Sequence, residues 1–183
     1  MASTINATTS SGIVATADNT GSLALQSAGT TIMTITSTGV TTQVGAPAFS
    51  AYMSATQSVT NATYTKLQCN TEQYDTNSNY DTTNYRFTPT VAGYYLVNTN
   101  ISGPTTAAGI LAPAIYKNGS YYWNLAAFSN TAAGIQISSS FLMYLNGSTD
   151  YIEFYVYQTT GGSASIYGGT GNTTFQAFLA RSA

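Results

Sequence analysis

The chain has 183 residues, a formal net charge of −2 and only 5% charged side chains, against about 25% in ordinary soluble domains. Its four cations are scattered, so it lacks the clustered Lys and Arg that neutralise phosphates, and no nucleic-acid partner is expected. There is no histidine, the commonest general base, and the single Cys69 excludes an internal disulfide.

Residues 1–45 contain no aromatic side chain and are rich in Thr, Ser, Ala and Gly. Short apolar bursts separated by glycines predict short strands joined by glycine turns. Because such a segment cannot bury a core alone, it is either disordered or ordered against a partner. We expect an interwoven oligomeric stem or an arm docked on a larger surface. The candidate anchoring residues are Leu23, Leu25, Ile32, Ile35 and Val40.

Residues 46–183 carry the pattern of an all-β domain. The predicted strands span 49–54, 63–69, 85–87, 93–101, 112–117, 120–128, 135–145, 151–158 and 173–180. Asn118-Gly119 predicts a tight hairpin turn, and Asn146-Gly147 predicts a second turn. Short strands at this spacing indicate a sandwich or a jelly roll.

Alternation along residues 151–158 separates two faces of one predicted strand. Ile152, Phe154 and Val156 share the face that we expect in the core. Tyrosines dominate the other face, which carries Tyr151, Glu153, Tyr155 and Tyr157. Tyr is favoured at interfaces because its ring is apolar and its hydroxyl is polar. A solvent-facing row of tyrosines is the alternative.

The stretch from Asp75 to Asp81 places Asp and Asn at every second position, as the beginning of a calcium-binding loop does. An EF-hand loop requires Gly at its sixth position and Glu at its twelfth, where this chain has Tyr80 and Arg86. A looser calcium site formed by Asp75, Asp81 and Glu72 is the alternative. We favour Asx side chains that cap turns, so no metal or other cofactor is expected.

Candidate catalytic groups are sparse. Cys69 lies in an apolar strand pattern, which favours a small buried residue over a nucleophile. Asp150 and Glu153 are close in sequence, but the pattern does not set them opposite each other. A phosphate-binding glycine loop is also absent, so the sequence predicts a protein that is not an enzyme.

The sequence carries no targeting pattern. The first residues, MASTINATTSSG, have neither the basic nor the apolar region of a secretory signal. No run approaches the roughly 18 apolar residues of a membrane helix. We therefore expect synthesis in a cytoplasm without Sec-dependent export.

A series of motifs follows in order from Ala48 to Ala180. In chain order they are AFSAYMS, NSNYDTTNYRFTPTVAGYYLVN, IYKNGS, FLMYLNGSTDYIEFYVYQ and TFQAFLA. This order resembles the C1q/TNF-like jelly-roll family, with its Phe-Ser-Ala strand, Tyr-Asp loop, Pro-x-x-Gly-x-Tyr-Tyr strand, Asn-Gly hairpin and closing Phe-x-Gly-Phe-Leu strand. The chain departs from that pattern at Ala177, where the family has Gly, and at Ser148 and Thr149, which lengthen a turn.

The resemblance implies a homotrimer in which one sheet of each jelly roll faces a threefold axis. Carried over by position, Tyr95 and Val97 should lie in the core, while Tyr94 and Leu96 should face the axis. The candidate trimer interface comprises Tyr94, Leu96, Tyr155, Tyr157 and Phe175.

The segment GIVATADNTGSLALQSAG stands where C1q proteins have a collagen stalk, and it resembles N-terminal segments of bacteriophage tail and fibre proteins. We therefore expect a bacteriophage virion protein: a trimeric capsid decoration protein, of the cement or head-fibre type, that displays C1q-like heads and docks on a virion protein. The alternative is a tail-fibre module that recognises a host-surface glycan or protein. Exposed Tyr and Trp123 would then stack on sugars, although we expect Trp123 in the core.

Overall fold

The computed structural model of the chain describes residues 21–43, 45–103, 109–125, 128–130 and 135–183. It divides the chain into two units, Met1–Val44 and Gly45–Ala183, and the second is called the head below. All regular elements in the described residues are strands, so the predicted all-β fold is confirmed. Residues 1–20, which include the first part of the phage-like segment, lie outside the described residues.

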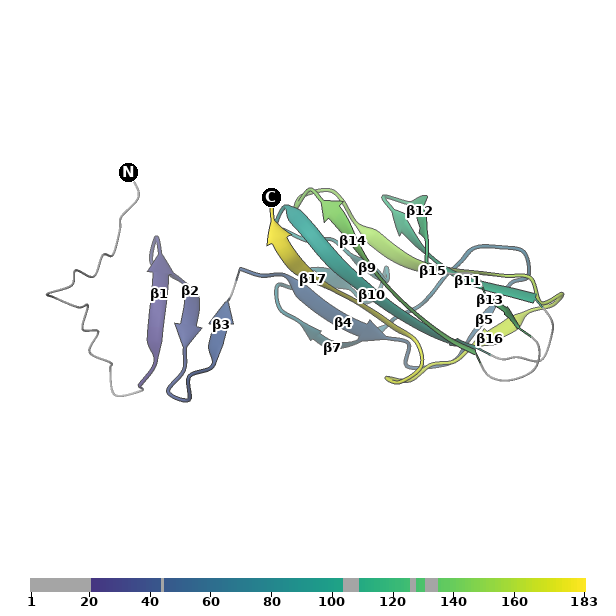
Figure 1. Ribbon diagram of the computed structural model, residues 1–183, viewed down its shortest axis with the longest axis horizontal. Helices are drawn as coiled ribbons and strands as arrows, with labels where there is room; N and C mark the ends of the chain where they lie inside the picture. Colours follow the sequence, from purple (N-terminus) through teal and green to yellow (C-terminus); the bar gives the residue numbers. More distant parts are fainter. Residues whose placement is uncertain (1–20, 44, 104–108, 126–127, 131–134) are drawn as a thin grey trace, which may run out of the picture. The chain divides into compact units, whose positions relative to one another are not determined.

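The described part of the first unit is an antiparallel sheet, called the arm sheet, of β1 (Leu23–Ser27), β2 (Thr30–Ile35) and β3 (Thr41–Gln43) (Figure 1). The register of β1 and β2 puts four apolar residues on one face, namely Leu23, Leu25, Met33 and Ile35. Ile32 belongs to the other face, and Val40 lies just before β3. None of the described residues of this sheet is buried, so its apolar face needs cover. The anchoring role of these residues stays a prediction.

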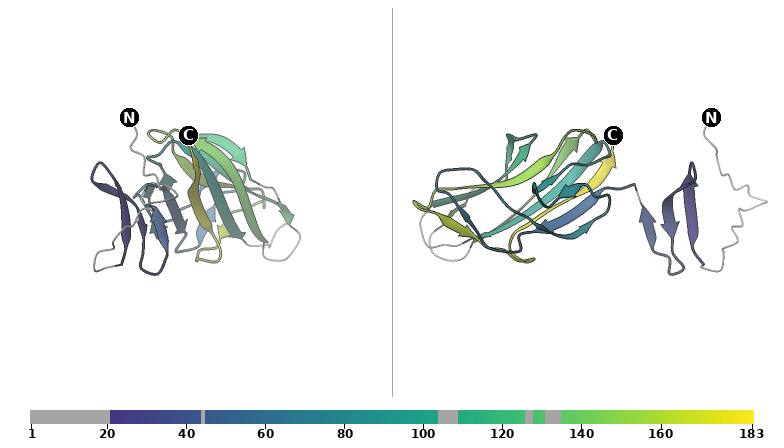
Figure 2. Two further views of the ribbon diagram at one scale, coloured as in Figure 1. Left: turned by 60° about the vertical axis from the view of Figure 1, so that its left-hand side comes forward. Right: turned by 180° about the vertical axis from the view of Figure 1, so that it is seen from behind.

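Within the described residues, the head consists of two large antiparallel sheets that pack face to face (Figures 1 and 2). The five-stranded sheet has the order β14-β10-β17-β4-β7. Its strands are β14 (Ile135–Leu145), β10 (Gly93–Gly103), β17 (Thr174–Ser182), β4 (Ala48–Tyr52) and β7 (Thr71–Asp75).

The seven-stranded sheet has the order β12-β11-β15-β9-β8, with β13 paired to β11 and β6 paired to β15. Its strands are β12 (Ser120–Asn124), β11 (Gly109–Lys117), β15 (Ile152–Gln158), β9 (Arg86–Phe87), β8 (Tyr80–Asp81), β13 (Phe128–Asn130) and β6 (Thr65–Lys66). A separate pair joins β5 (Gln57–Val59) to β16 (Ala164–Ile166).

Aromatic rings from both sheets form the core between them. Phe49 of the five-stranded sheet stacks on Tyr80 and Phe87, with ring centroids 4.6 and 4.5 Å apart. Phe175 meets Phe49 edge-on at 5.0 Å and lies 5.7 Å from Phe154 of the opposite sheet. Rings that bury this much area dominate the packing energy of a core.

Phe175 is a core residue, so its assignment to the trimer interface is wrong. Its side chain is 0% exposed within a single chain and therefore cannot reach a second chain. Alternation along β17 turns Phe175 and Ala177 inward and Phe178 outward. By contrast, Tyr95 and Val97 are fully buried, as the sequence predicted.

The observed strands differ from the predicted ones where a strand is short or its residues are polar. Of the predicted strand over 63–69, only β6 is a regular strand. In place of the predicted strand over 120–128, the structure has the separate strands β12 and β13. The sequence did not predict β5, β7, β8 or β16. β7 has the sequence TEQYD, without an apolar alternation, and it is a strand because β4 offers it a pairing edge.

Candidate interaction surfaces of the head

An apolar patch lies on the outer face of the five-stranded sheet. It comprises Tyr94, Leu96, Leu142, Tyr144 and Phe178, from β10, β14 and β17. Tyr94 pairs with Tyr144, and Leu96 lies between Leu142 and Phe178, so the side chains are contiguous across three strands. Leu142 is 56% exposed, and the other members are exposed or half-buried. Such a large uncovered patch marks an interaction surface more often than a solvated one.

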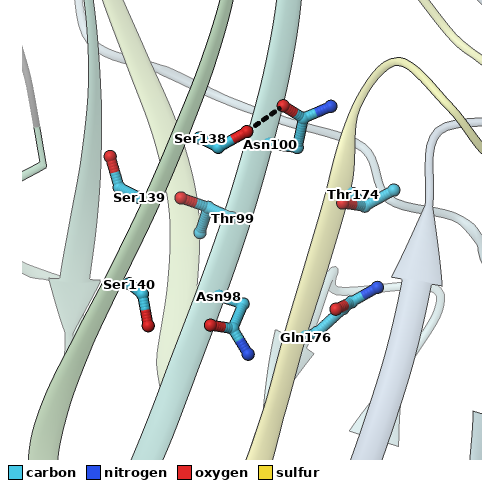
Figure 3. Close-up of a pocket in the computed structure, with 8 residues that line it drawn as sticks. All are labelled: Asn98, Thr99, Asn100, Ser138, Ser139, Ser140, Thr174 and Gln176. Atoms are coloured by element: carbon cyan, nitrogen blue, oxygen red, sulfur yellow. Dashed lines mark hydrogen bonds between the residues drawn. The ribbon is translucent and has the colours of Figure 1, made fainter.

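The same outer face becomes polar further along these strands. A depression with a volume of about 310 Å³ lies there. Side chains of β10, β14 and β17 line it (Figure 3). The outward-facing members are Asn98, Asn100, Ser138, Ser140, Thr174 and Gln176. The Ser138 hydroxyl donates to Asn100 Oδ1 at 2.8 Å, and Gln176 Nε2 donates to the Ser50 hydroxyl at 3.0 Å. The depression carries no charge and is suited to polar, uncharged contacts.

The structure divides the candidate trimer interface between two opposite faces of the head. Tyr94 and Leu96 belong to the apolar patch. Tyr155 and Tyr157 lie on the outer face of the seven-stranded sheet, because Phe154 and Val156 fill the inner face of β15. This alternation along β15 agrees with the prediction. The interface role of the four residues stays a prediction, and a single flat contact cannot include both pairs.

Sequence reasoning missed Leu142, Tyr144 and Phe178 as members of the patch. The sequences of β14 and β17 carry apolar residues on both faces, and this pattern could have identified the three residues. Met143 and Ala177, their neighbours in sequence, are the buried ones. Alternation identifies two faces, but it does not say which face lies inward. Only the pairing of β14 and β17 with the two sides of β10 brings the outward residues together.

Trp123 is on the surface, so the expectation that it lies in the core is wrong. It is 51% exposed on β12, at an edge of the seven-stranded sheet. Its ring lies parallel to that of Phe141, with the ring centroids 6.1 Å apart. Phe141 belongs to β14 at an edge of the other sheet, so the two rings cover the opening between the sheets at this side.

The carboxylates of the calcium-like stretch are used by neighbouring backbone groups. Asp75 accepts hydrogen bonds from the N–H groups of Asn77 and Tyr80, and Asp81 from those of Thr83 and Asn84. Side-chain and backbone donation by Asn84 lowers the pKa of Asp81. The predicted turn-capping role is therefore confirmed. Among the described residues, His, Cys, Asp and Glu form no group of three that could hold a metal ion.

Cys69 is fully buried, as its apolar surroundings predicted. Burial raises the pKa of its thiol to about 12, so the reactive thiolate is not populated at neutral pH. Its backbone carbonyl accepts a hydrogen bond of 2.7 Å from the Tyr80 hydroxyl. These contacts give Cys69 a packing role.

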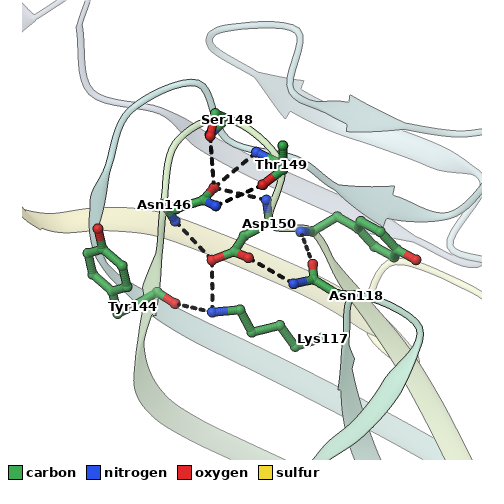
Figure 4. A network of polar contacts seen from close by, with 8 residues as sticks. Lys117, Asn118, Tyr144, Asn146, Ser148, Thr149 and Asp150 are labelled. Atoms are coloured by element: carbon green, nitrogen blue, oxygen red, sulfur yellow. Dashed lines mark hydrogen bonds and ion pairs between the residues drawn. The ribbon is translucent and has the colours of Figure 1, made fainter.

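A polar network fixes the two predicted turns to each other (Figure 4). Asp150 accepts hydrogen bonds from Asn118 Nδ2 at 2.8 Å and from the Asn146 N–H at 3.0 Å, and its Oδ2 lies 2.8 Å from Lys117 Nζ. Burial opposes ionisation of Asp150, but these donors outweigh it and lower its pKa. Asn118 and Gly119 have φ values of 54° and 75°, as a two-residue hairpin turn with two left-handed residues requires. The network links β11 to the connection between β14 and β15.

No family model and no curated protein matches the sequence. Solved structures do match the head. The globular domain of zebrafish complement 1qA is 15% identical, with a TM-score of 0.53, over 75% of this chain and 98% of that chain. Murine APRIL at pH 5.0 is 10% identical, with a TM-score of 0.58, over 73% and 98%. The PRD1 vertex protein P5 is 15% identical, with a TM-score of 0.54, over 74% and 97%.

These likenesses concern the fold, because all three identities are below the level at which function transfers. Among the described residues, no helix is long and apolar enough to cross a membrane. The matched structures include a complement 1qA globular domain, a TNF structure and a vertex protein, each with a TM-score above 0.5 over about three quarters of this chain. The predicted C1q/TNF-like jelly-roll fold of the head is thereby confirmed.

Proposed function

We propose that the protein is a structural component of a bacteriophage virion that assembles as a homotrimer through the apolar patch. In this proposal, it decorates the capsid as a cement or head-fibre protein and displays its heads, while residues 1–45 dock on a virion protein. The likeness of the head to the PRD1 vertex protein P5 supports a place in a virion. The low charge of the chain supports a surface that neighbouring subunits cover in part.

The apolar patch is the observation that carries the proposal. Its two leucines, two tyrosines and one phenylalanine span three neighbouring strands, and no segment of the described head covers them. Association that buries these side chains stabilises the assembly by roughly 25 cal/mol for each Å² of apolar surface removed from water. The uncharged depression beside the patch adds side chains that can make hydrogen bonds between subunits.

The first test is the solution mass of the full chain and of two variants by light scattering. We expect a mass near three times 19.2 kDa for the unchanged chain. Leu142→Asp should give single chains, because a charge within the patch cannot be buried without a partner. Gln136→Asp, an exposed position on the same face of β14 but outside the patch, should leave the trimer intact. A single-chain mass for the unchanged protein would contradict the proposal.

The second test addresses anchoring by the arm sheet. Leu25→Asp places a charge on its apolar face, and Thr42→Asp places one on the opposite face. If the apolar face docks on a virion protein, Leu25→Asp should lower the amount of protein in purified particles, measured by quantitative mass spectrometry. Thr42→Asp should be incorporated normally. Equal incorporation of both variants would rule out this face as the docking surface.

The alternative function is a receptor-binding module of a tail fibre. Exposed aromatic side chains on the seven-stranded sheet favour it, because this face lies opposite the apolar patch. The two functions are compatible in one trimer, since each uses a different face of the head.

A further inference from the structure

Five tyrosines converge on the outer face of the seven-stranded sheet, and they are called the tyrosine cluster here. Its members are Tyr64, which precedes β6, Tyr116 of β11, Tyr121 of β12, and Tyr155 and Tyr157 of β15. Tyr116 and Tyr155 stack with ring centroids 3.9 Å apart. Tyr64 lies 5.0 Å from Tyr157 and 5.4 Å from Tyr121, so it joins the two ends of the cluster.

Small residues on β11 leave space for these rings. Ala112 pairs with Tyr157 and Ala114 pairs with Tyr155, so β11 presents only methyl groups where the tyrosines of β15 stand. The tyrosine rings contact one another across the sheet and form one continuous aromatic surface. Tyr121 is 49% exposed and Tyr64 is 37% exposed, so this surface is open to solvent.

The tyrosine cluster offers hydroxyl groups and no free charge. The nearest carboxylate, on Glu153, is almost fully buried and binds Lys66 Nζ at 2.7 Å, so the two charges compensate each other. Burial, with the charge of Glu153, raises the pKa of Tyr155 to about 12, and burial also raises the pKa of Tyr64 and Tyr116. The hydroxyls of Tyr64, Tyr116 and Tyr155 therefore stay protonated at neutral pH. A phenol hydroxyl can both donate and accept hydrogen bonds.

The chemistry of the cluster differs from that of the apolar patch. The patch mixes leucine and phenylalanine with tyrosine, as the core of a protein–protein contact does, whereas every ring of the cluster carries a hydroxyl. A neutral sugar presents C–H groups on the face of its ring and hydroxyls around its edge, which match aromatic faces and phenol groups. The Arg86 guanidinium, on the neighbouring strand β9, lies over the ring of Tyr151, which is not part of the cluster. We propose that the tyrosine cluster binds neutral oligosaccharides, with sugar rings placed over Tyr64 and Tyr121.

The test measures binding of the full-length protein to an immobilised panel of oligosaccharides. The panel contains neutral oligomers of glucose, galactose, mannose, rhamnose and N-acetylglucosamine, with sialylated and sulfated oligomers for comparison. We expect binding to one or more neutral oligomers. Tyr121→Ala and Tyr64→Ala should each weaken it by about tenfold, the loss of one aromatic contact. Tyr121→Phe, which keeps the ring, should weaken it less.

Matched controls separate the cluster from exposed tyrosines in general. Tyr74 is 50% exposed and Tyr167 is 38% exposed, close to the values for Tyr121 and Tyr64, and both lie outside the cluster. Tyr74→Ala and Tyr167→Ala should leave binding unchanged.

Three results would overturn the proposal. They are the absence of binding to any neutral oligomer, a preference for the charged oligomers, and equal losses in the control variants. If no oligomer binds and Tyr121→Ala lowers the mass of the assembly, the cluster is a contact between protein chains. The proposal does not rest on the trimer, because binding is measured whether the protein is a trimer or a single chain.

Discussion

The outer faces of the two sheets of the head differ in chemistry although both are rich in exposed aromatic rings. On the five-stranded sheet, aliphatic side chains join the rings, and an uncharged depression lies beside them. On the seven-stranded sheet, the rings are tyrosines, and alanines of β11 lie directly across from those of β15. On the first face, aliphatic and phenyl groups lie between two tyrosines, so much of its water can be lost to another protein surface. On the second face every ring of the cluster carries a hydroxyl group that must remain hydrogen-bonded.

This difference shows why exposed aromatic content alone does not identify an interface. Both faces contain exposed tyrosine, but only one combines it with Leu142 and Phe178. The residues between the rings decide whether burial is favourable. We therefore assign self-association to the five-stranded face and ligand binding to the seven-stranded face, and both assignments are proposals that the following predictions sharpen.

The largest expected effect is the difference in unfolding free energy between a substitution on the core side of β17 and one on its outer side. Phe175→Ala should lower the free energy of unfolding by about 3–5 kcal/mol, because it empties a site packed against the rings of Phe49, Tyr80 and Phe154. In single chains, Phe178→Ala removes the same ring from the outer face and should cost less than about 1 kcal/mol, because that ring is 42% exposed there. Urea unfolding of both variants in the Leu142→Asp background, where the proposed trimer contact is lost, measures the two losses. Similar losses would show that the core and the outer face of β17 are wrongly distinguished.

An intermediate effect is expected in the network that holds the ends of the two sheets together. Asp150→Asn should destabilise the head by about 1–3 kcal/mol at neutral pH, because Lys117 and Asn118 lose a charged acceptor. The lowered pKa of Asp150 means that its carboxylate stabilises the fold above its unfolded pKa of about 4. That contribution is lost as the pH falls through the lower folded pKa.

The check is the urea midpoint of the unchanged chain and of Asp150→Asn between neutral pH and pH values well below 4. The difference between the two proteins should shrink as the pH falls. Glu72→Gln, at an exposed carboxyl on β7, is the control and should leave the pH profile unchanged. A constant difference across the pH range would contradict the assigned role of Asp150.

The smallest expected effect concerns the tyrosine cluster itself. A double-mutant cycle of Tyr116→Ala and Tyr155→Ala should give a coupling energy of about 0.5–1.5 kcal/mol, since the two rings stack directly. Tyr74 and Tyr121 lie on different sheets, so their alanine variants should be additive within about 0.5 kcal/mol. Additivity of the stacked pair would mean that the cluster is loosely packed and not a preformed surface.

The sequence by itself determined the fold class and the local features. Period-two alternation distinguished Phe154 and Val156 from Tyr155 and Tyr157, because the pleat sends successive side chains to opposite faces. Asn118-Gly119 specified its turn, since both residues accept left-handed backbone angles. The Asx-rich stretch and buried Cys69 were also interpreted correctly, because their capping and burial depend on nearby residues.

Tertiary structure alone decided which residues share a surface. Phe175 and Phe178 are both phenylalanines on one strand. One is buried and the other is exposed, because only one face of β17 packs on the other sheet. The apolar patch and the tyrosine cluster gather residues that are far apart in sequence, such as Tyr64 and Tyr157. Strand order creates these neighbours, and strand order is set by the packing of the whole sandwich. Local pattern constrains which side of a strand a residue occupies, but the partner strands determine what lies beside it.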